Sequence, residues 1–408
     1  MHCGIDFGTS NTTMAVRGVN GPVLVPLENG AVTIPTALFY TVGNREILFG
    51  RAAVKAYLDG QEGRFMRSLK RVLGTSLMEG SVLVNGARTN FDVIIGRFLS
   101  HIRHRAEEHC GNSLTDVTIG RPVHFQDGNP EADARAENQL RAIAEKSGFK
   151  NIRFQYEPIA AALAHEKNVA GEKLALVIDI GGGTSDFSVI RLSRDYQPGR
   201  DRAGDILANT GVRIGGNDCD KAINLDTAMP LLGMGSAYGD KNLAMPLLLY
   251  HELSEWSKVN WTYTPQNINM VRSLAREAHA PDKIQLLENV LEEQLGHKIL
   301  DVSENLKITL AGQENAAADF SFLAPQLQRA MTQAEMGTLL GAILFPVRTM
   351  MLETLHLAGV AAKDIAIIVL TGGSTGLPVF RHWVAEYFPH ATVLQEDRLG
   401  SVGLGMVL

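Results

Sequence analysis

The sequence predicts an α/β protein built from two related lobes. Short apolar runs rich in β-branched residues, such as Leu174 to Ile180 and Ile365 to Leu370, alternate with stretches of helical character. That alternation indicates largely buried sheets connected by helices. In addition, IDFGTSNTTMAV near the start of the chain is echoed by IDIGGGTSDFSVI further along. The echo predicts a strand–turn–strand unit in each of two lobes.

The lobe boundaries follow from the positions of these patterns. We expect the first lobe to span residues 1–172, with residues 393–408 returning to it and an inserted subdomain at about 36–93. The second lobe would span residues 173–392, with an inserted, mainly helical subdomain at about 220–300.

Helices are predicted where proline precedes residues at helical spacing. Pro130 to Ser147 has Leu140 and Ile143 on one face and Gly148 as its stop, and Pro158 to Lys167 is rich in alanine. Residues 225–300 contain helical patterns, such as Lys283 to Leu295, and no clear strand.

Composition limits the classes of function. The chain has 408 residues, of which 45% are hydrophobic and 20% charged, and its net charge is −6. These values are typical of a globular protein and give no basic field, so we expect no nucleic-acid or membrane partner. Its three cysteines, Cys3, Cys110 and Cys219, are far apart and predict neither disulfides nor a zinc site. With no signal-peptide pattern at the N-terminus, a cytoplasmic location is expected.

The two echoed turns carry the chemistry. Asp6 and Asp179 end the first strand of each unit, and glycines and hydroxyl residues follow them at once. Such turns expose backbone N–H groups that bind phosphate oxygens, while Mg²⁺ prefers one or two carboxylates together with water and phosphate. Asp6 and Asp179 are therefore predicted to hold Mg²⁺ through water. The phosphate donors would come from Gly8, Thr9, Ser10, Asn11, Gly181, Gly182, Gly183 and Thr184.

A purely structural role for these turns is the alternative. A single D-x-G-T turn is equally consistent with side-chain hydrogen bonds inside the turn. The duplication and the three successive glycines of the second copy favour phosphate. The loops differ from a Walker A motif, because the chain contains no GxxxxGK[ST] sequence.

These loops resemble the two phosphate loops of the actin, hexokinase and heat-shock ATPase superfamily. The stretches KRVLG, FQYEPIAAAL, RIGGNDCD and LTGGSTGLP then occur in the order found in DnaK-type heat-shock chaperone ATPases. VTIGRPVHF and MPLLGMGS look closest to the YegD subgroup of that family. The resemblance covers the whole chain.

The resemblance implies a fold and an activity. The fold would be a two-lobed actin-like ATPase of duplicated RNase H-like domains, with a nucleotide cleft between the lobes and a helical insertion in the second. The activity would be Mg²⁺-dependent ATP binding and slow hydrolysis to ADP and phosphate, coupled to lobe closure. A protein client or co-factor protein would be the partner besides nucleotide.

The same resemblance assigns roles to single residues. Lys70 would compensate charge at the γ-phosphate, and the carboxylates of Asp6, Glu157, Asp179 and Asp186 would order Mg²⁺ waters and the attacking water. The remaining nucleotide contacts would come from Gly216, Asp218, Glu304, Lys307, Gly372, Gly373 and Ser374.

Each role has a simpler alternative. Lys70 lies in a basic run that is typical of a solvated helix face. Glu157 precedes a proline and is favourable at any helix start. Glu304 and Lys307 have the spacing of a surface ion pair.

The sequence departs from the family pattern in three places. Gly376 stands where an arginine that stacks on adenine is usual, and Ala311 stands where a serine is usual. The chain also ends at Leu408, shortly after Gly403 and Gly405, so we expect no peptide-binding domain.

Two further functions are compatible with this fold. One is a nucleotide-gated binding or filament module with little hydrolysis. The other is a small-molecule kinase, although the chain shows no sugar-kinase motif.

Overall fold

The chain forms two compact units. The computed structural model describes residues 1–19, 21–43, 45–126, 128–166, 169–195, 203–394 and 400–408. The first unit comprises Met1–Gly215, Pro346–Thr375 and Phe380–Leu408, and the second comprises Gly216–Phe345 and Gly376–Val379. The lobe boundaries expected from the sequence stay a prediction, and part of the predicted C-terminal return, residues 395–399, lies outside the described residues.

The first unit contains two large sheets with the same design. One has the strand order β11 (Asn151–Tyr156), β10 (Asp116–Arg121), β1 (His2–Phe7), β2 (Asn11–Gly18) and β3 (Gly21–Leu24), with β4 (Thr33–Pro35) also paired to β2. Strands β10 and β11 run parallel to β1, whereas β2 and β3 alternate in direction.

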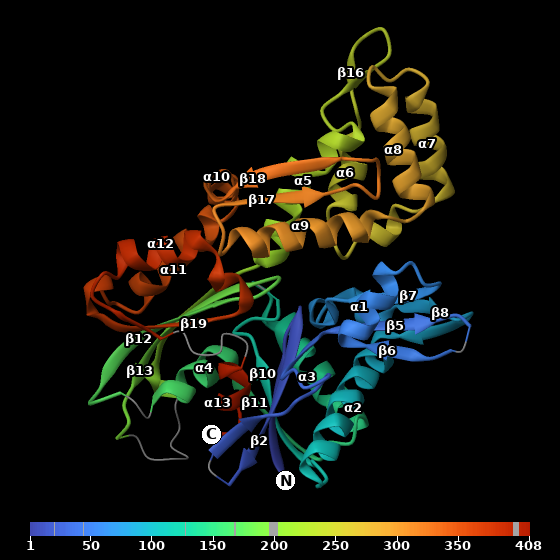
Figure 1. Ribbon diagram of the computed structural model, residues 1–408. Coiled ribbons are helices and arrows are strands. Elements are labelled where there is room, and N and C mark those ends of the chain that lie inside the picture. Colours follow the sequence, from blue (N-terminus) through green and yellow to red (C-terminus); the bar gives the residue numbers. More distant parts are fainter. Residues whose placement is uncertain (20, 44, 127, 167–168, 196–202, 395–399) are drawn as a thin grey trace. The chain divides into compact units, whose positions relative to one another are not determined.

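The second sheet repeats that order and those directions. Its strands are β20 (Thr392–Leu394), β19 (Ile365–Thr371), β12 (Lys173–Ile180), β13 (Ser185–Leu192) and β14 (Ile206–Val212). Strands β19 and β20 run parallel to β12, and β13 and β14 are antiparallel. Both predicted hairpins are therefore confirmed, and each lies at the centre of its sheet (Figure 1).

Alternation along β1 explains how the first sheet is buried. Cys3, Ile5 and Phe7 point to one face, where they join a core with α2 (Phe91–Cys110) and α3 (Pro130–Lys146). Asp6 faces the opposite way, because side chains on a strand alternate between the two faces. Helix α3 matches its prediction closely: it ends at Lys146, and Gly148 has a φ of +97° that favours glycine.

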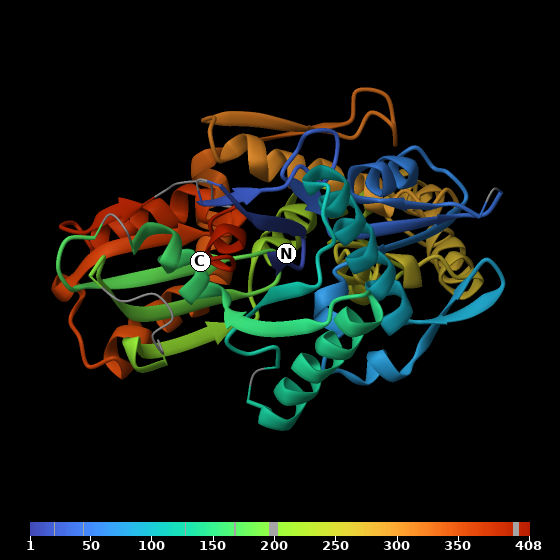
Figure 2. The same cartoon turned by 90° about the horizontal axis from the view of Figure 1, so that it is seen from below.

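Two short helices with small residues pack closely in the first unit. Helix α4 (Glu157–Glu166) follows β11, and α13 (Ser401–Gly405) lies beside it in both views (Figures 1 and 2). A Cβ atom on Gly405 would lie 1.8 Å from the Ala160 carbonyl oxygen, so only glycine permits this approach. The predicted helix Pro158–Lys167 begins one residue earlier, and Lys167 lies outside the described residues.

A series of shorter elements follows the first hairpin, and their expected grouping as an inserted subdomain at about 36–93 stays a prediction. The series consists of β5 (Ala37–Thr41), β6 (Ile47–Phe49), α1 (Gly50–Leu58), β7 (Gly63–Arg67), the 3₁₀ helices η1 (Leu69–Val72) and η2 (Ser76–Glu79), β8 (Ser81–Val84) and β9 (Ala87–Asn90). The remaining elements that begin or lie in the first unit are η3 (Ala203–Asp205), η6 (Ala362–Asp364) and η7 (Gly373–Gly376).

The second unit is mainly helical. Its elements are α5 (Gly216–Thr227), η4 (Met229–Leu232), β15 (Ala237–Tyr238), β16 (Leu243–Ala244), α6 (Leu247–Leu253), η5 (Val259–Trp261), α7 (Pro265–Ala275), α8 (Pro281–Glu292), α9 (Gly296–Leu310), β17 (Asn315–Asp319), β18 (Gln328–Thr332) and α10 (Gln333–Ile343). Helices α7 and α8 pair side by side, and the β17–β18 hairpin lies along α9 (Figure 1).

The short β15–β16 hairpin corrects the expectation that residues 225–300 hold no strand. Its two residue pairs are joined by a turn in which Gly239 and Asn242 have positive φ. A strand of two residues is too short to leave an alternating pattern in the sequence.

Helices α11 (Phe345–Leu357) and α12 (Pro378–Tyr387) each begin in residues assigned to the second unit and continue in the first. Within the described ranges, no single helix is long and apolar enough to cross a membrane. Helices α10 and α11 meet that criterion only when they are taken together as a bent pair.

Candidate functional site

A pocket in the first unit is lined by the turns of both central hairpins. Its lining residues are Asp6, Gly8, Thr9, Ser10, Asn11, Lys70, Glu157, Asp179, Gly181, Gly182, Thr184, Thr371, Gly372, Gly373 and Val402. The structure thus brings together most of the residues that the sequence singled out. Their binding of nucleotide stays a prediction.

The first turn is held open by Thr36. The Thr36 hydroxyl donates to the Gly8 carbonyl at 2.8 Å, and the Thr36 backbone N–H donates to the Ser10 carbonyl at 2.8 Å. A Cβ atom on Gly8 would lie 2.2 Å from the Asn11 carbonyl oxygen, so the turn requires glycine there. Because Thr36 binds these two carbonyls, the backbone N–H groups of the turn can point toward an anion.

The second turn is also fixed from outside. It closes with a hydrogen bond of 3.0 Å from Gly181 N to the Thr184 carbonyl, and the Ser374 hydroxyl donates to the Gly181 carbonyl at 3.1 Å. Beyond the glycine's own neighbours, a Cβ atom on Gly181 would meet only that Thr184 oxygen, at 3.8 Å. The space in front of Gly181 is therefore open to a ligand.

Lys70 and Glu157 form a buried ion pair beside these turns. The Lys70 Nζ atom lies 2.6 Å from Glu157 Oε1, and each side chain is 10% exposed. Lys70 sits on the 3₁₀ helix η1 and Glu157 on the first turn of α4. Burial rules out the alternative that Lys70 belongs to a solvated helix face.

The pocket concentrates acidic groups. Strand register sets Asp179 directly opposite Asp186, so their side chains share a face of the second sheet. Burial, and then the Glu157 and Asp186 carboxylates, raise the pKa of Asp179 to about 8. Burial, and then Glu157, also raise the pKa of Asp6 well above its usual value, although Lys70 opposes this.

The same carboxylates shift the pKa of Lys70. Burial disfavours its ammonium form, but the Glu157 and Asp6 carboxylates outweigh burial and raise the pKa of Lys70 above its ordinary value. The ammonium is thus charged at neutral pH. Lys70 therefore gives the pocket a positive charge that can stabilise negative charge on a bound ligand.

The donor set suits a divalent cation bound with water and phosphate. Several carboxylates crowd one buried site, and a hydrated Mg²⁺ would relieve their repulsion. Among the residues that the structure describes, no three His, Cys, Asp or Glu side chains converge as a ready-made metal cage. Water and phosphate oxygens would complete the coordination of a hydrated Mg²⁺ held by one or two of these carboxylates.

Sequence reasoning missed Arg71, the residue after the predicted lysine. The Arg71 Nη2 atom donates to the Gly183 carbonyl at 2.9 Å. A Cβ atom on Gly183 would lie 2.4 Å from Arg71 Nε, so the arginine side chain covers this part of the glycine turn. The Lys-Arg pair in KRVLG could have indicated this contact. Adjacent residues on a tight 3₁₀ turn point in different directions, so the two side chains can bind two different partners.

Thr371 and Val402 also line the pocket without having been predicted. Gly372, which was predicted, has a φ of +79°, and a Cβ atom there would lie 2.4 Å from the Ile180 carbonyl oxygen. Glycine is thus required where β19 leads into the pocket.

The other predicted nucleotide contacts belong to the second unit. Gly216 and Asp218 begin helix α5, and Glu304 and Lys307 lie on α9. Lys307 is buried and pairs with Asp220 at 2.6 Å. Its Nζ atom also donates to the Gly216 carbonyl at 3.2 Å. Lys307 is therefore buried against the start of α5 and does not lie on the surface, and its ribose contact stays a prediction.

The fold and pocket define a class of α/β protein in which two central hairpins, one in each of two like sheets, face a common site. Comparison with known sequences identifies the family. The profile of the Hsp70 protein family matches residues 81–226 and 267–403. The chain belongs to the Hsp70 family, which confirms the family-level resemblance. The finer YegD assignment stays a prediction.

Curated relatives cover nearly the whole chain. Proteins described as "Chaperone protein HscA homolog" from Burkholderia cenocepacia, Burkholderia orbicola and Burkholderia multivorans are each 26% identical over 424 aligned residues. The alignments cover 99% of this chain and 57% of each relative. The chain therefore spans little more than half the length of these relatives.

Proposed function

We propose that this chain binds ATP with Mg²⁺ and hydrolyses it slowly, as the nucleotide-dependent part of a heat-shock-type chaperone function. One observation carries the proposal: two glycine turns, a buried Lys70–Glu157 pair and a group of carboxylates line a single pocket. Membership of the Hsp70 family and similarity to chaperone proteins support it.

The chemistry follows from the positions of the charges. Phosphoryl transfer needs positioned groups and charge compensation more than covalent catalysis. The turns at Gly8 and Gly181 would hold phosphate oxygens, and Lys70 would offset negative charge that develops on the transferred group. Glu157 and Asp179 would orient the attacking water. Mg²⁺, held through water by Asp6 and Asp179, would neutralise charge on the phosphate oxygens.

Binding would also couple to movement. In the proposed two-lobed, actin-like arrangement, a polyphosphate that contacts both turns binds the closed form more tightly than the open form. Such differential affinity shifts the population toward closure. A client or co-factor protein that distinguishes the two forms would then respond to the bound nucleotide.

Calorimetric titration of the purified chain with ATP and Mg²⁺, followed by a single-turnover assay of phosphate release, tests the proposal. We expect binding and a slow release of inorganic phosphate. Absence of binding at millimolar ATP would refute it. Binding without phosphate release would point to the nucleotide-gated module, and transfer to an added sugar would point to a kinase.

A further inference from the structure

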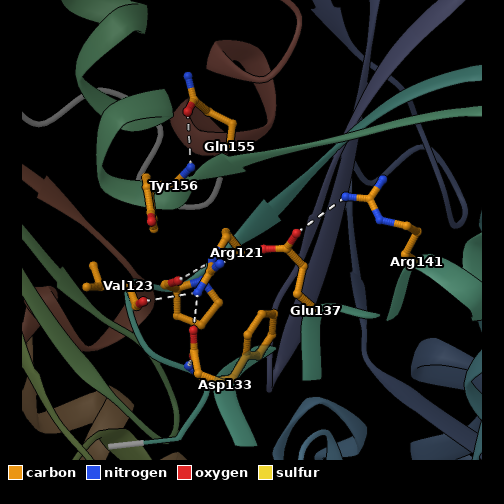
Figure 3. Close-up of polar contacts among 9 residues, drawn as sticks. Arg121, Val123, Asp133, Glu137, Arg141, Gln155 and Tyr156 are labelled. Atoms are coloured by element: carbon orange, nitrogen blue, oxygen red, sulfur yellow. Dashed lines mark hydrogen bonds and ion pairs between the residues drawn. The ribbon is translucent and has the colours of Figure 1, made fainter. Parts of the chain in front are cut away.

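An arginine outside the pocket is surrounded by partners that the proposed chemistry does not use (Figure 3). Arg121 ends strand β10, and its guanidinium pairs with Asp133 at 2.6 Å and Glu137 at 2.5 Å, both on helix α3. It also donates to the carbonyls of Pro122 at 3.1 Å and Val123 at 3.2 Å. A planar guanidinium held by four acceptors has a fixed position and direction.

The same guanidinium covers an aromatic ring next to the pocket. Its Cζ atom lies 5.1 Å from the centroid of the Tyr156 ring and 5.5 Å from that of Phe125. Arg121 and Tyr156 are register partners on the parallel strands β10 and β11. A cation at this distance from a ring restrains the ring and the backbone that carries it.

Tyr156 directly precedes Glu157, the acidic half of the buried pair. Glu157 also rests on the neighbour of Arg121: a Cβ atom on Gly120 would lie 3.0 Å from Glu157 Cγ. The two residues that support Glu157, Gly120 and Tyr156, are thus each joined to Arg121, one by the chain and the other across the strands. Arg121 is therefore linked to Glu157 by two routes.

Helix α3 also contacts the segment that follows Lys70. The Gln139 side chain accepts a hydrogen bond of 2.8 Å from Gly74 N, shortly after Lys70. Gly74 has a φ of +76°, and a Cβ atom there would lie 2.6 Å from the Ala132 carbonyl oxygen. One rigid helix therefore supports both segments that carry Lys70 and Glu157.

We infer that Arg121 is a positioning residue that sets Glu157 against Lys70 for phosphoryl transfer. The inference rests on the proposed function of the pocket. Arg121 would act through Tyr156 and the end of β10, without touching nucleotide. Small displacements of catalytic groups cause large losses in rate, so a change at Arg121 should slow chemistry while leaving binding nearly intact.

Arg141, which lies on helix α3, provides a matched control. It contacts the same Glu137 at 3.3 Å, donates to the Ile152 carbonyl at 2.9 Å, and lies 4.9 Å from the Phe154 ring. Arg141 therefore makes the same kinds of contact with α3 and β11. Its ring partner, Phe154, lies two residues further along the chain from Glu157 than Tyr156 does. Arg141→Gln therefore tests whether a loss of stability alone changes the rate.

The first test compares Arg121→Gln with Arg141→Gln in single-turnover hydrolysis of ATP with Mg²⁺ and in ATP titrations. We expect Arg121→Gln to reduce the rate by about tenfold or more and to change the ATP Kd less than about threefold. Arg141→Gln should leave both nearly unchanged. Equal rates for the two variants would overturn the inference.

A second measurement does not depend on hydrolysis. Crystal structures of the two nucleotide-free variants would show whether Lys70 Nζ still lies at its contact distance from Glu157 Oε1. We expect the contact to be lost in Arg121→Gln and kept in Arg141→Gln, and an intact contact in both overturns the inference. If the wild type does not hydrolyse ATP, the proposed function fails and this comparison alone decides the role of Arg121.

Loss of Arg121 leaves Asp133 partly buried without its cation, so the variant has to be checked for folding. Tyr156→Leu avoids that problem, because it removes the ring and leaves every ion pair of Arg121 in place. It should slow single-turnover hydrolysis in the same direction. A folded Tyr156→Leu variant with the wild-type rate would contradict the route through Tyr156.

Discussion

Comparing Gly372→Ala with Gly359→Ala separates the steric effect of an added Cβ atom from the effect of the backbone conformation. Gly372 has a φ of +79°, and a Cβ atom there would lie 2.4 Å from the Ile180 carbonyl oxygen and 2.7 Å from Asp179 Oδ1. Gly359, also in the first unit, has a φ of +67° with no atom within 4 Å of a built Cβ. Gly359→Ala therefore changes the backbone preference alone.

The expected magnitudes follow from these contacts. A non-glycine residue in the left-handed region costs roughly 1–2 kcal/mol, partly offset by about 0.4–1 kcal/mol from the stiffer unfolded chain. Gly359→Ala should thus lose about 1 kcal/mol. Gly372→Ala must in addition displace the end of β12, which typically costs about 1–3 kcal/mol more. The displacement moves Asp179 and the Gly181 turn, so ATP affinity should fall about tenfold, equivalent to 1.4 kcal/mol.

Amide hydrogen exchange is the suitable assay, because it reports local opening free energies within a chain of two units. Peptides covering β12 and β19 should exchange faster in Gly372→Ala than in the wild type, and should be unchanged in Gly359→Ala. Calorimetry with ATP and Mg²⁺ gives the affinities. Equal affinities for the two variants would show that the contact with Ile180 and Asp179 does not shape the ligand site.

Three further predictions concern the pocket. Lys70→Ala should lower single-turnover hydrolysis by about 10²-fold or more while ATP still binds in calorimetry, because the ammonium acts mainly on developing charge; a wild-type rate would exclude Lys70 as a catalytic group. Gly181→Val should abolish the rise in melting temperature caused by ATP and Mg²⁺ while the ligand-free melting temperature stays near the wild-type value, since the new side chain fills open space where phosphate would bind. Because burial, with Glu157 and Asp186, raises the pKa of Asp179 to about 8, the folded chain holds a proton that the unfolded chain releases above about pH 4. The nucleotide-free free energy of unfolding should therefore fall from about pH 4 to pH 8 in urea titrations. The slope should be smaller in Asp179→Asn, where the raised pKa of Asp6 still contributes, and an unchanged slope would place the proton elsewhere.

The local features of this protein were predictable from the sequence. The echo of Asp6 in Asp179 identified both hairpins, because strand alternation and tight glycine turns are short-range properties. Proline and glycine likewise marked the ends of α3. The β15–β16 hairpin escaped prediction because its strands are too short to show a period.

The partners of side chains depended on the tertiary structure. Lys70 looks like part of a solvated basic run until the fold buries it against Glu157, 87 residues further along the chain. Lys307 is buried against Asp220, although its spacing from Glu304 is that of a surface ion pair, and Arg121 finds two carboxylate partners on the helix that follows its own strand. Residue type and spacing determine what a side chain can do, but desolvation and long-range packing decide which groups it meets and which protonation states they keep.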